Sequence, residues 1–192
     1  LISFSQWFGT GIGVDSDPEM INTARAKGIG APRVSFFVME GEHLGFADNS
    51  FDAVLTRHAP VHVPELDRVT KGDGLFICQG VGANNMANIR EAFETGSGTR
   101  YEDEYLRQIA DLQTRGWSVL VTASYDVRYW VQDLPSLLFW FKAIAGANEV
   151  PADFSIQRHG PIIQDLIGRH IEHRGFATNE HRTLLIARKS LS

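Results

Sequence analysis

The chain has 192 residues, of which 43% are hydrophobic, and a formal net charge of −5. This length suits one domain with a substantial core, and the acidic balance argues against a broad electrostatic grip on nucleic acid without excluding a local basic patch. The single cysteine, Cys78, excludes an internal disulfide and a Cys/His zinc cluster, and it fits a reducing compartment. We see no apolar run that could span a bilayer and no secretion signal, and therefore expect a cytoplasmic protein.

The first half of the chain predicts an alternation of strands and helices. Apolar runs at residues 12–14, 34–39, 51–56 and 75–79 are typical of strands in a parallel sheet that is covered on both faces. A helix is expected over residues 18–26. Ser16 and Glu19 have the spacing of a capping box, Pro18 suits the first helical turn, and Gly28 supplies the stop.

The second half is less regular. Its pattern predicts helices over residues 88–94, 101–115, 131–144 and 162–173, and strands over residues 117–124 and 181–189. A loop is expected at residues 146–153 and a turn at Gly175 and Phe176.

One acidic residue stands at a position where open α/β sheets bind nucleotides. The apolar run of Ile12 to Val14 ends in Asp15, and a helix begins almost at once. A carboxylate at the carboxyl end of a buried strand can accept two hydrogen bonds from the hydroxyls of a ribose. The same carboxylate can also interact with the macrodipole of the following helix, and the two roles can coexist.

Three segments, in this order and spacing, resemble the class I S-adenosylmethionine (SAM)-dependent methyltransferases, especially their type 11-like branch. They are Gly13-Val14-Asp15-Ser16-Asp17-Pro18-Glu19-Met20, residues 40–54 and residues 68–76. The resemblance implies a Rossmann-like, doubly wound α/β sheet, mostly parallel with an antiparallel last strand, and a helical, aromatic cap region. It also implies one domain, with a cofactor-binding half at 12–82, an acceptor-side region at 83–180 and a final strand at 181–189.

The resemblance further implies that SAM is the cofactor and that specific residues hold it. Asp15 and Ser16 would lie at the ribose, the run from Glu40 through Gly41 to Glu42 at the adenine, and Arg57 and His58 at the methionine portion. Glu40 stands where the family usually has Asp, and its alternative is a solvated loop acid. For His58 a structural role weighs slightly above a catalytic one. The acceptor would meet His62, Tyr129 and Trp130, and no metal site is expected.

One departure from the family pattern concerns the glycine-rich loop. The family's first strand ends in an acidic, glycine-rich loop, and a helix should separate that loop from Asp15. The run of glycines from Gly9 to Gly13 is too close to Asp15 to be this loop, since a parallel crossover needs a dozen residues or more. We therefore expect that the first strand and its loop are either missing or omitted from the sequence near residues 8–12.

The sequence as a whole predicts a SAM-dependent methyltransferase. Its acceptor would be a small molecule, and methyl transfer would be an in-line displacement that needs a general base only for some acceptors. Two alternatives remain: an NAD-dependent Rossmann oxidoreductase, whose acidic residue also binds a ribose, and a non-catalytic, methyltransferase-like binding subunit.

Overall fold

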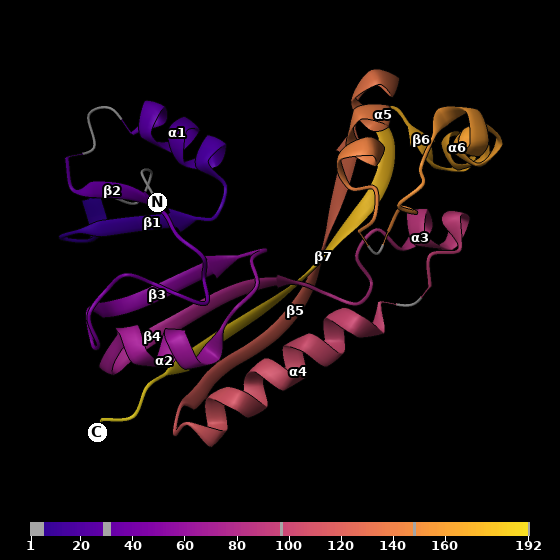
Figure 1. Ribbon diagram of the computed structural model, residues 1–192. Helices are drawn as coiled ribbons and strands as arrows, with labels where there is room; N and C mark the ends of the chain where they lie inside the picture. Colours follow the sequence, from indigo (N-terminus) through magenta and orange to yellow (C-terminus); the bar gives the residue numbers. More distant parts are fainter. Residues whose placement is uncertain (1–5, 29–31, 97, 148, 192) are drawn as a thin grey trace. The chain divides into compact units, whose positions relative to one another are not determined.

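The computed structural model describes residues 6–28, 32–96, 98–147 and 149–191 (Figure 1). The chain divides into two compact units. The first contains residues 1–54, 59–75 and 189–192, and the second contains residues 55–58 and 76–188. Because the chain passes between them more than once, each unit is built from segments that are distant in the sequence.

The first unit begins with a strand, a helix and a second strand: β1 (Gly11–Asp15), α1 (Pro18–Lys27) and β2 (Val34–Val38). The two strands pair in parallel, with Gly11 opposite Val34 and Asp15 opposite Val38. Gly28 ends α1 as expected, but the N-cap is Asp17, whose side chain accepts a hydrogen bond from the Glu19 N–H. The predicted Ser16 capping box is therefore wrong, and Asp17 satisfies the helix donor instead.

The larger sheet has five strands. The strands are β3 (Phe51–Arg57), β4 (Thr70–Val81), β5 (Ser118–Val131), β6 (Ile171–Glu172) and β7 (Gly175–Arg188). Their order in the sheet is β3-β4-β7-β5, and the short strand β6 also pairs with β7. The long strands β5 and β7 run side by side and antiparallel over almost their whole length (Figure 1). The expected antiparallel last strand is thus present, and the chain has an α/β fold with both parallel and antiparallel pairs.

The helices of the second unit enclose its core. They are α3 (Ala87–Phe93), α4 (Thr99–Thr114), α5 (Leu134–Ala143) and α6 (Ile156–His170), and α4 lies along β5 (Figure 1). Side chains from α3, α5, α6 and β7 contribute to a buried hydrophobic cluster, which includes Ile89, Phe141, Leu166 and Phe176. Edge-to-face ring contacts, such as Phe93 with Phe141 at 5.6 Å between centroids, stabilise this cluster beyond the effect of the area that it buries.

Several predicted boundaries are wrong for identifiable reasons. Pairing with β7 extends β5 to Val131, so the helix expected from residue 131 begins only at Leu134, after the Asp133 N-cap. The helix expected from residue 162 begins at Ile156, because Ser155 caps it. The predicted turn at residues 175–176 is the start of β7, and the strand expected at residues 75–79 begins earlier, at Thr70.

The short helix α2 (Val63–Val69), which follows β3, was not predicted. At seven residues it is too short to show a clear hydrophobic period. None of the helices in the described residues is both long enough and apolar enough to cross a membrane.

Candidate functional site

The first unit brings two acidic residues to neighbouring strand ends. Asp15 is the last residue of β1 and lies opposite Val38, the last residue of β2. The Met39 N–H donates to the Asp15 carbonyl oxygen at 3.0 Å, and Glu40 follows Met39 in the chain. Both acids are exposed. The parallel register therefore places two acidic residues together at the carboxyl end of the two-stranded sheet.

The backbone at the start of α1 holds the Asp15 side chain. Its Oδ1 accepts a hydrogen bond from the Asp17 N–H at 2.9 Å, and Asp17 Oδ1 in turn accepts from the Glu19 N–H at 2.8 Å. Within the described residues, Oδ2 of Asp15 has no hydrogen-bond partner. One oxygen thus orients the carboxylate while the other stays free to accept a hydroxyl. Ser16 lies between Asp15 and Asp17 in the sequence, and it is exposed.

A turn follows Glu40. The His43 N–H donates to the Glu40 carbonyl oxygen at 3.0 Å, and Gly41 and Glu42 lie exposed within this turn. A side-chain carbon placed on Gly41 would meet no atom within 4 Å. The backbone of this turn is therefore open on its outer side, as a loop must be if a planar ring is to lie against it.

Arg68 of α2 fastens the segment that follows this turn. Its guanidinium donates to the carbonyl oxygens of Leu44 at 2.9 Å and Phe46 at 2.7 Å, and it pairs with Asp48 at 2.8 Å. It also binds both carboxylate oxygens of Glu65, at 2.7 and 2.8 Å. The sequence placed Arg68 in a family-like segment but assigned it no role, since only the Glu65–Arg68 spacing on α2 hints at a pair.

Glu65 is the acidic centre of this arrangement. The Arg68 guanidinium, helped by the Leu44 N–H that donates to Glu65 Oε1 at 2.7 Å, lowers the pKa of Glu65 from its ordinary 4.5 to about 2. Only 13% of the Glu65 side chain is exposed. Glu65, Arg68 and the backbone of the 44–48 loop are therefore joined in one hydrogen-bond network.

This pKa makes the stability of the chain depend on acid pH. The folded pKa of Glu65 is below its unfolded value, so its contribution is complete above about pH 4.5 and is lost as the pH falls toward 2. We expect Glu65→Gln to lower the urea midpoint at pH 7, and the difference from the unsubstituted protein to shrink at pH 3. Urea titrations at both pH values measure it. A difference that stays constant between them would contradict the assignment.

In the second unit, Arg57 and His58 lie at the end of β3. Arg57 Nε donates to Gln79 Oε1 at 2.9 Å, and Gln79 Nε2 donates to the Tyr125 hydroxyl at 2.5 Å. The His58 N–H donates to the Gln79 carbonyl oxygen at 3.0 Å. A chain of polar contacts thus runs across one face of the sheet, from β3 through β4 to β5.

His58 has an unusual backbone and a shifted imidazole. Its φ of 53° lies in the left-handed region, where a non-glycine residue is uncommon and where strained site residues often occur. Partial burial lowers the pKa of His58, and the nearby positive charges of Arg182 and Arg57 lower it further, while Glu180 opposes them. The imidazole is therefore neutral at neutral pH.

The three residues predicted to meet an acceptor have different surroundings. His62 belongs to the first unit, at the N-cap position of α2, and makes no capping bond with its side chain. Tyr129 and Trp130 belong to the second unit. The Tyr129 ring lies 5.8 Å from that of Trp140, whereas Trp130 Nε1 donates to Glu172 at 2.9 Å beneath the guanidinium of Arg174.

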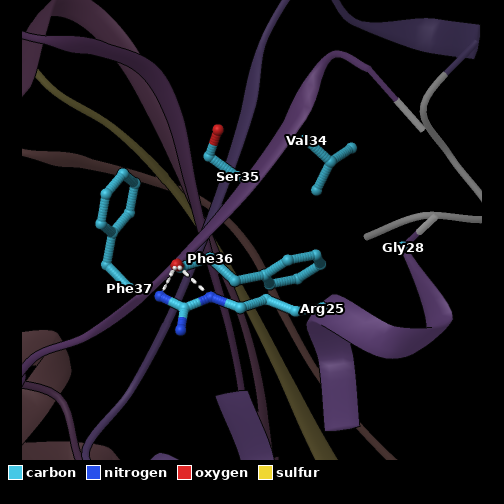
Figure 2. Close-up of a pocket in the computed structure, with 6 residues that line it drawn as sticks. All are labelled: Arg25, Gly28, Val34, Ser35, Phe36 and Phe37. Carbon is cyan, nitrogen blue, oxygen red and sulfur yellow. Dashed lines mark hydrogen bonds between the residues drawn. The ribbon is translucent and has the colours of Figure 1, made fainter. Parts of the chain in front are cut away.

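A pocket of about 330 Å³ lies elsewhere in the first unit, between the end of α1 and β2 (Figure 2). Arg25, one of the lining residues, donates two hydrogen bonds to the Phe36 carbonyl oxygen, at 2.8 and 3.2 Å. Its lining contains none of the predicted site residues: Arg25, Gly28, Val34, Ser35, Phe36 and Phe37. It is thus distinct from the edge where Asp15 and Glu40 lie.

Comparisons with known proteins identify a methyltransferase-like domain in this chain. Residues 2–78 match the family model of a methyltransferase domain. No curated protein matches the sequence.

The fold is similar to solved structures over nearly the whole chain. A putative methyltransferase from Bacillus halodurans has a TM-score of 0.63 at 16% identity, with 98% of this chain and 86% of that one covered. The YcgJ protein from Bacillus subtilis has a TM-score of 0.57 at 20% identity, covering 99% and 86%. A SAM-dependent methyltransferase from Methanosarcina mazei has 0.55 at 14% identity, covering 98% and 85%. The family match confirms the resemblance to methyltransferases over residues 2–78, and these neighbours confirm the Rossmann-like fold.

Proposed function

We propose, on the premise of this confirmed resemblance, that the protein binds SAM and transfers its methyl group to a small-molecule acceptor. The observation that carries the proposal is the register of β1 and β2, which sets Asp15 and Glu40 at adjoining strand ends. An adenosine has hydroxyl donors at its ribose and an amino donor at its adenine. Two carboxylates on neighbouring strands are suited to accept from these two ends at once.

The described residues fit this ligand. Asp15 is already oriented by the Asp17 N–H and keeps Oδ2 free for the ribose hydroxyls, with Ser16 beside it. Glu40 would accept from the adenine amino group, and the open turn at Gly41 and Glu42 would lie against the ring. Arg68 would act as a positioning residue, since it fixes the loop that follows this turn.

The bound ligand supplies a methyl group on a positively charged sulfur, which departs as a neutral thioether and needs no metal. The task of the chain is to hold acceptor and methyl in line. The proposal places Arg57 and His58 near the methionine portion, and His62, Tyr129 and Trp130 at the acceptor. A neutral His58 is able to take a proton from an acceptor that loses one on methylation.

Calorimetric titration with S-adenosylhomocysteine, the product form of the ligand, tests the proposal. We expect saturable binding of S-adenosylhomocysteine and none of NAD at the same concentrations. The NAD arm separates methyl transfer from a dinucleotide-dependent oxidoreductase, for which the comparisons give no support. Tighter binding of NAD than of S-adenosylhomocysteine would overturn the proposal, and so would binding of neither.

A further inference from the structure

The outer edge of β5 has the features of a pairing surface. Within the described residues, β5 pairs only with β7, so its other edge offers unpaired backbone groups over a strand of 14 residues. Natural edge strands are usually protected by lysine, proline, a bulge or short length. Residues 121–131 contain neither lysine nor proline, and the one irregularity of this strand lies at its start, between Val119 and Val121.

One face of this edge is apolar and exposed. Side chains alternate along a strand, so Tyr125, Val127 and Tyr129 share a face. They are 40%, 44% and 40% exposed. On the opposite face, Asp126 and Arg128 are the only charged residues between Ser118 and Val131, and they have opposite signs.

The sequence Tyr125-Asp126-Val127-Arg128-Tyr129 is complementary to itself when it is read in reverse. If two copies pair antiparallel about a two-fold axis at Val127, each Asp126 faces Arg128 of the other copy, and each Tyr125 faces Tyr129. Both are favourable cross-strand pairs. Moving the axis by one residue would place Asp126 against Asp126, or Arg128 against Arg128, which is unfavourable.

Both charged side chains bond within the chain and are exposed. Asp126 is held by the Asn179 side-chain amide, which donates to its Oδ1 at 2.7 Å. Arg128 pairs with Glu172, yet 61% of the Arg128 side chain stays exposed. Each chain thus carries an exposed acid and an exposed base two residues apart on its edge strand, and both also bond to residues on the β7 side of their own sheet.

We propose that the protein forms a two-fold symmetric homodimer in which the β5 edges of two copies pair antiparallel about Val127. Residues 124–130 of one copy face residues 130–124 of the other. The pairing would join the two five-stranded sheets into one, and it is independent of the proposed methyl transfer. A ladder of this length buries an area at the low end of specific interfaces, so we expect a dissociation constant in the micromolar range.

Two single charge reversals and their mixture test the register. With Asp126→Lys both facing residues become positive, and with Arg128→Asp both become negative, so each variant repels a copy of itself. We expect each to dimerise at least about 10-fold more weakly than the unsubstituted protein, in sedimentation velocity at low salt. An equimolar mixture restores opposite charges at both contacts, and we expect it to form heterodimers.

Three results would overturn the proposal. The unsubstituted protein could be monomeric up to about 500 µM, or the single variants could dimerise as well as the unsubstituted protein does. The third such result is an equimolar mixture of folded variants that stays monomeric. Circular dichroism establishes whether each variant is folded, since both substitutions also remove a bond within the chain.

A cross-linking experiment keeps the proposal open to test if either variant is unfolded. Val127→Cys places two thiols on the axis, at the Cα separation of directly opposed residues, which a disulfide can bridge. Leu120→Cys is the matched control: it is exposed on the same strand, but its two copies would lie about 46 Å apart. The native Cys78 is buried. We expect rapid oxidative dimerisation of the first variant alone, and equal rates for both would overturn the proposal.

Discussion

Asp15→Ala is expected to weaken the binding of S-adenosylhomocysteine by about 100-fold, because it removes a charged acceptor of two hydrogen bonds. The effect should be large because the carboxylate is already oriented, so the protein loses no side-chain freedom when the ligand binds. Titration calorimetry of the variant and of the unsubstituted protein measures the ratio. The fold should be unchanged, since Asp15 is exposed and its one described side-chain bond is to the Asp17 backbone.

Asp17→Asn is the matched control for this experiment. It removes a negative charge from the same helix start but keeps an oxygen that can cap α1, which Asn does as well as Asp. We expect its affinity to stay within about 3-fold of the unsubstituted value, since helix-end and surface charges have small effects. If Asp15→Ala binds as well as Asp17→Asn does, the assignment of Asp15 to the ribose is wrong.

Arg68→Ala is expected to lower the melting temperature by about 5–10 °C, the largest loss of stability among the substitutions considered. The substitution removes every bond from this guanidinium to the 44–48 loop and leaves the mostly buried Glu65 carboxylate with the Leu44 N–H as its hydrogen-bond partner among the described residues. Removing one partner of such a pair costs more than the pair itself contributes. Differential scanning calorimetry at pH 7 provides the measurement.

Lys71→Ala is the control for Arg68→Ala. Lys71 pairs with Asp52 at 2.8 Å, but both side chains are well exposed, at 44% and 88%. Exposed pairs of this kind contribute little to stability, so we expect a change of no more than about 2 °C. Equal losses for the two variants would show that the Arg68 contacts are ordinary surface pairs rather than an anchor for the loop.

Local signals in the sequence were sufficient to predict those helices and strands whose ends they mark. Pro18 and Gly28 enclose α1, and the apolar runs before Asp15 and from Val34 onward give β1 and β2 almost to the residue. The capping residue was misassigned because Ser16 and Asp17 both offer a side-chain oxygen at the helix start. The extended backbone of Asp17 decides between them, with φ −85° and ψ 114°.

The full length of β5 depends on a partner that is far away in the sequence. The predicted strand ended at Ser124, although Tyr125, Val127 and Tyr129 continue its alternation with Asp126 and Arg128 between them. Pairing with β7 continues to Val131 because the backbone bonds of a ladder do not depend on side-chain polarity. The same applies to Arg68, whose partners on the 44–48 loop lie 20 to 24 residues away.

The sequence alone was enough to predict the fold class, the resemblance to class I methyltransferases and the two acids of the proposed site, because each depends on the order of residues within a short segment. Only the tertiary structure placed Asp15 beside Glu40 and made Arg68 the anchor of the 44–48 loop. It also left the outer edge of β5 without a paired strand among the described residues. Those features depend on strand register and on contacts between distant segments, which local patterns do not encode.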